Sequence, residues 1–164
     1  MNVCKEDIFR RIFEKWSGSL RSFIAYRAKD VHVAEDVVQD AFHTLWVNCE
    51  KVSPEKAKSY LFTVAQNSYL NLAKRQGRQR EFLSTQKDRQ STDPQFIMEM
   101  KEFESKLMNG IESLPDDVRA IFLMNRIDKL KYREIADILE LSVKTIEKKM
   151  HLALVELRKI HPKV

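Results

Sequence analysis

Apolar residues recur at steps of three and four along most of this chain, which is the period of an α-helix with one buried side. The 164 residues include only 3 Gly and 4 Pro, so few positions interrupt this pattern. No stretch alternates apolar and polar residues as a half-buried strand would. The sequence therefore predicts an all-α protein.

Three segments with this period lie in the first half of the chain. The first runs from Ile8 past Gly18 to Ile24, the second covers residues 33–49, and the third covers residues 57–72. The polar stretch EKVSPEK separates the second from the third. We expect the three helices to pack as one bundle.

A change of composition marks a domain boundary. The stretch STQKDRQSTDP, residues 84–94, is polar and free of aromatic residues, as linkers are. We therefore divide the chain into a first domain over 1–83, a linker over 84–104 and a second domain over 105–164. In the second part, we expect a short helix over 95–109 and another that starts with Pro-Asp-Asp after Leu114, because proline and acidic residues suit a first helical turn.

The stretch YREIADILELSVKTIEKKMHLALVELRK, residues 132–159, has the layout of a helix-turn-helix. A short helix over 133–139 is followed by a turn, and Ser142 can cap the next helix. Glu140 occupies the turn position where such motifs commonly place Gly, which predicts a non-Gly residue at positive φ.

The second helix of this motif has a basic face that fits the major groove of DNA, where cations and polar side chains meet bases and phosphates. The alternative is an ordinary helical hairpin whose cations are solvated. The candidate DNA-contacting residues are Lys144, Thr145, Glu147, Lys148, Lys149 and His151.

Charge is unevenly distributed. Lys and Arg number 29 against 24 Asp and Glu, a net charge of +5. Residues 74–80, KRQGRQR, contain only cations among their charged residues, and residues 35–40, EDVVQD, contain only acids. Two surfaces of opposite charge predict two different partners.

The acidic segment has helical spacing. Asp36, Gln39 and Asp40 share one edge of the second helix and can pair with cations of a partner helix, although a solvated acidic edge is the alternative. Asp40 and His43 also have the spacing of a di-iron ligand pair. No second such pair is present, so we expect no metal site and no cofactor.

The two cysteines, Cys4 and Cys49, have no CxxC spacing, which predicts reduced thiols in a cytosolic protein. The first 16 residues are too charged for a signal peptide, and the longest apolar run is AIFLM at 120–124, far shorter than a membrane span. We expect a soluble, cytoplasmic protein without membrane insertion.

Taken together, these motifs resemble an RNA polymerase sigma factor of the extracytoplasmic-function (ECF) branch, from about residue 8 to residue 160. EDVVQDAFHTLW resembles the polymerase-binding part of region 2, and KSYLFTVAQNSYLNLAKRQGR its minus-ten part. SLPDDVRAIFLMNRIDKLKYREIADIL and LSVKTIEKKMHLALVELR resemble the two parts of region 4.

The resemblance implies an initiation factor that catalyses no covalent reaction. Its partners would be core RNA polymerase, through the β′ clamp helices and the β flap, promoter DNA, and an anti-sigma factor. Region 4 would read the minus-thirty-five element. The implied polymerase-binding residues are Asp36, Gln39, Asp40 and Phe42.

The third helix would then open the minus-ten element, which requires rings and amides that replace the stacking and pairing of captured bases. Asn67 matches the position that meets an extruded base, and Thr63 stands where many relatives carry Arg. For Phe62 and Tyr69, packing inside the protein is an equal alternative. The candidate minus-ten residues are Tyr60, Phe62, Asn67, Tyr69 and Asn71, followed by the phosphate-binding Lys74, Arg75, Arg78 and Arg80.

Two other functions compete with this interpretation. A stand-alone helix-turn-helix regulator would have no need of EDVVQDAF. An enzyme acting on nucleic acid would need carboxylate clusters, Gly-rich phosphate loops or a Cys/His nucleophile, none of which the sequence presents.

Overall fold

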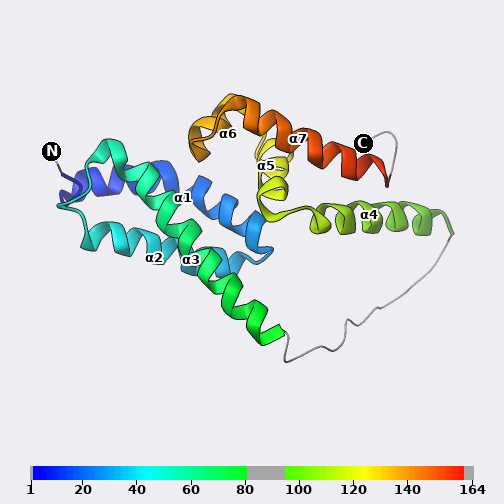
Figure 1. Cartoon of the computed structure of the whole chain (residues 1–164), viewed down its shortest axis with the longest axis horizontal. Coiled ribbons are helices and arrows are strands. Elements are labelled where there is room, and N and C mark those ends of the chain that lie inside the picture. Colours follow the sequence, from blue (N-terminus) through cyan, green and yellow to red (C-terminus); the bar gives the residue numbers. More distant parts are fainter. Residues whose placement is uncertain (1, 81–94, 161–164) are drawn as a thin grey trace.

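The computed structural model describes residues 2–80 and 95–160, and the side chains among them except those of 78–80 and 95–101 (Figure 1). These residues are helical with no strand, so the predicted all-α class is confirmed. The elements are α1 (Glu6–Ala28), α2 (Val31–Val47), the 3₁₀ turn η1 (Pro54–Lys56), α3 (Ala57–Arg80), α4 (Gln95–Ser113), α5 (Asp116–Arg126), α6 (Tyr132–Leu139) and α7 (Val143–Arg158).

Helices α1, α2 and α3 form the predicted N-terminal bundle (Figure 1). Its centre consists of fully buried aliphatic side chains, among them Leu20, Ile24, Leu45 and Leu61. Helix α1 passes Gly18 without a break, and α2 begins at the Asp30 carboxylate, which accepts hydrogen bonds from the first backbone amides of the helix. The periodicity therefore located all three helices.

The prediction of reduced cysteines was wrong. Cys4 and Cys49 form a disulfide with a Cα–Cα distance of 4.9 Å. Cys4 lies two residues before the start of α1 and Cys49 two residues after the end of α2, and the packing of these two helices brings the ends together. A long-range pair of this kind, 45 residues apart, leaves no local spacing signal in the sequence.

The C-terminal domain contains α4 to α7 (Figure 1). Its helix-turn-helix has the predicted geometry, since Ser142 Oγ accepts a hydrogen bond from the Thr145 amide at 3.1 Å. Glu140 adopts the predicted left-handed conformation, with φ 55° and ψ 39°. The buried stripe of α7 consists of Ile146, Met150, Ala153 and Leu157, as its periodicity indicated.

The expected linker over 84–104 is partly helical. Helix α4 begins at Gln95, so residues 95–104 belong to a helix that continues into the second domain. The polar stretch 84–94 lies outside the described residues. Within the described part of the chain, no helix has both the length and the apolar character needed to cross a membrane.

Candidate nucleic-acid interface

The outer face of α7 gathers most of the predicted groove-reading residues. Lys144, Glu147, Lys148 and His151 are exposed and, together with Leu152, line a shallow hollow of about 470 Å³. Thr145 is half-buried at the start of the helix, where its hydroxyl lies 2.7 Å from that of Ser142. This face offers cations and polar groups at one-turn intervals, which suits a groove of DNA.

Lys149 does not belong to this face. It lies one step around the helix toward the core and pairs with the carboxylate of Asp117 on α5. Burial alone would raise the pKa of Asp117, but the hydrogen bond and the charge of Lys149 outweigh it, and the pKa is lowered. The structure therefore gives Lys149 an internal partner that competes with DNA.

The predicted minus-ten residues lie on two different sides of α3. At 3.6 residues per turn, the polar members of the set fall on one side of the helix. Asn67, Asn71, Lys74 and Arg75 are exposed there, and Tyr60 is half-buried at its start. The side chains of Arg78 and Arg80 lie outside those described.

Phe62 and Tyr69 lie on the opposite side of α3, in the core, and are 8% and 7% exposed. The Phe62 ring packs against Phe23 at 5.9 Å between centroids. The Tyr69 hydroxyl lies 2.7 Å from Asp116 Oδ2, and burial together with this carboxylate raises the pKa of Tyr69 to about 12. Both rings therefore serve packing in this structure, and we remove them from the minus-ten set.

The acidic edge of α2 is free to meet a partner, since Asp36, Gln39 and Asp40 are exposed. Phe42 is buried and makes edge contacts with Phe9 and Phe13 of α1. It contributes the apolar wall of a groove of about 480 Å³ that Gln39 also lines.

Sequence reasoning missed the α1 side of this groove. Phe13 lines it and is 47% exposed, and Trp46 is similarly exposed beside Phe9. The sequence feature that could have predicted this groove is an aromatic residue beside the buried stripe of α1, where a solvated face would carry a polar residue.

Comparison with known proteins matches both domains to one family. Residues 12–79 match the model for sigma-70 region 2, and residues 104–157 match the model for sigma-70 region 4. The chain is 28% identical over 140 residues to the ECF RNA polymerase sigma factor SigE of Mycolicibacterium smegmatis. The aligned region covers 82% of this chain and 54% of that relative. It is 23% identical over 135 residues to SigM of Bacillus subtilis, covering 80% of this chain and 81% of the relative.

A solved structure has the same fold. The sigma factor RpoE of Bartonella quintana, in a co-crystal structure with the anti-sigma factor NepR, has a TM-score of 0.57 and 20% identity, covering 93% of this chain and 95% of that one. This chain is thus a transcription initiation factor built of sigma-70 regions 2 and 4. It belongs to the ECF sigma-factor family, whose members are not enzymes.

Proposed function

We propose that this chain binds core RNA polymerase through the acidic edge of α2 and directs it to promoters that α7 and α3 recognise. The observation that carries the proposal is the presence, on one chain, of an exposed acidic edge and two polar or basic helix faces. A stand-alone DNA-binding regulator would need only the second kind of surface. The setting would be the cytoplasm, where polymerase and promoter DNA meet.

On the polymerase, Asp36, Gln39 and Asp40 would meet cations of the β′ clamp helices, and the groove beside Phe42 would accept an apolar side chain of the same partner. Charge pairs at an interface rim guide association, whereas a filled apolar groove slows dissociation. The second domain would be held by the β flap.

On the promoter, Lys144, Lys148 and His151 would contact the major groove of the minus-thirty-five element. Asn67 would offer both a donor and an acceptor to an extruded base of the minus-ten element. Lys74 and Arg75 would bind the adjacent phosphates.

An anti-sigma factor is the remaining proposed partner. The relative from Bartonella quintana was crystallised with one. A protein of this kind would inhibit the chain by covering the acidic edge of α2 or the basic face of α7.

Transcription in vitro tests the proposal. Purified core polymerase, supplemented with this chain and a pool of genomic promoters, should produce discrete transcripts that core enzyme alone does not. Reversing Asp36 and Asp40 to Lys should abolish both these transcripts and copurification with core enzyme. Glu14→Lys with Glu102→Lys, which changes the net charge equally at exposed positions elsewhere, should retain both activities. Stoichiometric copurification of the Asp36/Asp40 variant would reject this interface.

A further inference from the structure

The disulfide joins the segment before α1 to the α2–α3 connection, residues 48–53. Cys4 lies in the first segment and Cys49 in the connection. Figure 1 shows both segments at the same end of the first domain. Val3 and Val52, one from each segment, are 0% and 6% exposed, so both segments place a side chain in the core. The bond therefore fastens together two parts of the chain that complete this end of the domain.

The backbone hydrogen bonds of the connection are local. The Cys49 amide donates to the Trp46 carbonyl at 3.2 Å, and the Lys51 amide donates to the Asn48 carbonyl at 2.9 Å. Each of these bonds closes a turn of a few residues, and neither reaches α1 or α3. The disulfide, together with the buried Val52, attaches the connection to the rest of the domain.

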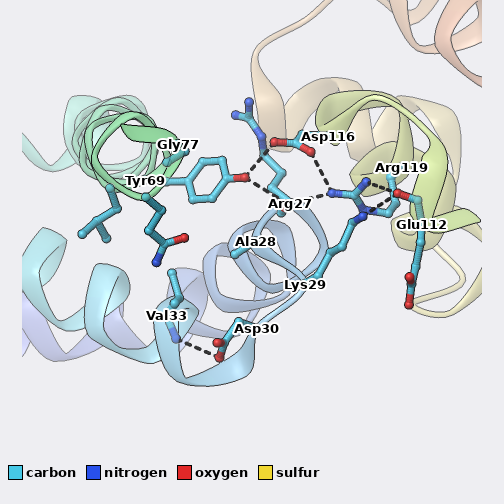
Figure 2. Close-up of a pocket in the computed structure, with 13 residues that line it drawn as sticks. Arg27, Ala28, Lys29, Asp30, Val33, Tyr69, Gly77, Glu112, Asp116 and Arg119 are labelled. Carbon is cyan, nitrogen blue, oxygen red and sulfur yellow. Dashed lines mark hydrogen bonds and ion pairs between the residues drawn. The ribbon is translucent and has the colours of Figure 1, made fainter. Parts of the chain in front are cut away.

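The other end of the first domain is held by contacts that no redox change would break. There the Tyr69 hydroxyl lies 3.0 Å from the carbonyl oxygen of Arg27, where α1 ends (Figure 2). The Arg27 guanidinium also lies over the rings of Tyr69 and Phe23, at 5.2 and 5.5 Å from their centroids. Breaking the disulfide should therefore loosen the connection and the start of α3, and leave the later turns of α3 in place.

The residues that follow the connection extend the minus-ten face of α3. Lys56 of η1 is exposed and precedes Tyr60 by four residues. Thr63 and Asn67, both exposed, follow Tyr60 at steps of three and four. Residues at these steps share one face of a helix. The position of the connection therefore sets where the first part of the minus-ten face lies.

We propose that Cys4 and Cys49 form a redox switch of strand opening, in which the disulfide orders the connection for binding the opened minus-ten strand and reduction lowers the yield of open complex. This inference rests on the proposed function. The cytoplasm keeps ordinary thiols reduced, so in that setting the bond would form in response to an oxidant. Both cysteines are partly exposed, as reaction with a small oxidant requires.

Hydrogen peroxide is the oxidant class that we name, and the reaction balances. One thiolate attacks a peroxide oxygen, which breaks the O–O bond and gives a sulfenic acid and a hydroxide ion. The second thiolate attacks the sulfenic sulfur, which forms the S–S bond and expels a second hydroxide ion. The two thiol protons convert both hydroxide ions to water. A dithiol reductant reverses the change, since its first thiolate forms a mixed disulfide and its second releases the chain with both thiols restored.

The direction of the switch follows from pre-organisation. Binding to a flexible segment costs the entropy of ordering that segment, and a covalent constraint removes part of this cost beforehand. The oxidised chain should therefore hold an opened strand more tightly than the reduced chain. Asp40 lies roughly two helical turns before Cys49, and α7 belongs to the other domain, so polymerase binding and minus-thirty-five binding should change little.

Wild type in its two oxidation states provides the test. Hydrogen peroxide prepares the oxidised chain and a dithiol reductant the reduced chain, and both reagents are removed before core polymerase is added. Alkylation of free thiols followed by mass spectrometry, without polymerase, measures the state of the cysteine pair. Permanganate footprinting on duplex promoter measures opening, and titrations with core enzyme and with promoter DNA measure the two earlier steps.

We expect peroxide to form the disulfide and the reductant to restore both thiols. Oxidised holoenzyme should yield about threefold to tenfold more open complex than reduced holoenzyme, with core affinity unchanged within about twofold. Cys4→Ser should open promoters as reduced wild type does, whichever reagent it has met. Leu20→Ala controls for lost stability, because it truncates a fully buried side chain in the bundle and leaves both cysteines intact. Its two oxidation states should still differ in opening by the wild-type ratio.

Three results would overturn the switch. The first is equal opening by the two states of wild type, and the second is a cysteine pair that peroxide does not join. The third is a loss of core binding as large as the loss of opening on reduction, since this marks unfolding of the whole domain. Each leaves the initiation function standing wherever transcripts are still produced. Absence of transcripts in both states would reject the proposed function, and the switch with it.

Discussion

Lys149 on α7 pairs with Asp117 on α5, on a different side of the helix from the basic face that its neighbour Lys148 occupies. The two adjacent lysines of one recognition helix therefore have different environments. Lys148 faces solvent, whereas Lys149 links α7 to α5 within the second domain.

Substitution should separate these two roles. Lys148→Ala should weaken promoter binding by holoenzyme and reduce its salt dependence by about one counterion, because a phosphate contact is lost. Lys149→Ala should leave the salt dependence unchanged and lower the free energy of unfolding by about 1 kcal/mol, because the half-buried Asp117 loses its partner. Promoter titrations at several salt concentrations and thermal denaturation measure the two effects. A reduced salt slope in Lys149→Ala would return this lysine to the DNA-binding face.

The disulfide should stabilise the first domain substantially. A bond that closes a loop of 45 residues restricts the unfolded chain, and the chain-entropy relation gives about 4 kcal/mol for a loop of this length. Cys4→Ser should therefore lower the melting temperature by on the order of 10 °C under non-reducing conditions. In excess reductant, wild type and Cys4→Ser should melt together. If they also melt together without reductant, the two thiols are not joined in solution.

Acid should weaken the junction between the domains through Asp116. Burial raises the pKa of this carboxyl, but the hydrogen bonds from Tyr69 and Arg119, with the charges of Arg119 and Arg27, outweigh it, so the pKa lies below its ordinary value of 3.8. A lowered pKa contributes stability that is complete above the ordinary value and is lost as pH falls toward the lowered one. Asp116→Asn removes this titration, so the melting temperature of the variant should fall less steeply than that of wild type between pH 5 and about 3. Parallel pH profiles would show that Asp116 does not titrate with folding.

Periodicity predicted the helices well, because each one buries a single stripe against its neighbours. The helix-turn-helix was predictable in detail, down to the left-handed Glu140, because capping and turn chemistry are local. For Phe62 and Tyr69 the sequence left packing and base contact as equal alternatives, and the structure favours packing, since both rings are buried on the same side of α3 as Leu61 and Ala65.

Contacts between segments that are far apart in the chain could not be predicted from the sequence in this way. The partners of Arg119 in α1 are backbone carbonyls more than 90 residues away, and any residue at those positions would present the same oxygen atoms. Neither composition nor spacing could therefore place the two domains against each other. The Cys4–Cys49 bond was missed for a related reason, since it depends on how α1 and α2 pack.

Asn67 provides the sharpest test of strand opening, because it is exposed on the same side of α3 as Asn71 and Lys74. An amide can replace both a donor and an acceptor of a lost base pair, and alanine can replace neither. Asn67→Ala, in holoenzyme, should leave closed-complex formation on duplex promoter nearly intact but reduce the yield of open complex, through a loss of roughly 1 to 3 kcal/mol of base capture. A template with a pre-melted minus-ten bubble should recover part of this loss, since unpairing no longer has to be driven. Gln66→Ala removes another exposed amide, from a different side of the same helix, and should open promoters as wild type does. Permanganate footprinting of unpaired thymines on both templates measures the yield, and equal reactivity of wild type and Asn67→Ala on duplex DNA would exclude base capture by this residue.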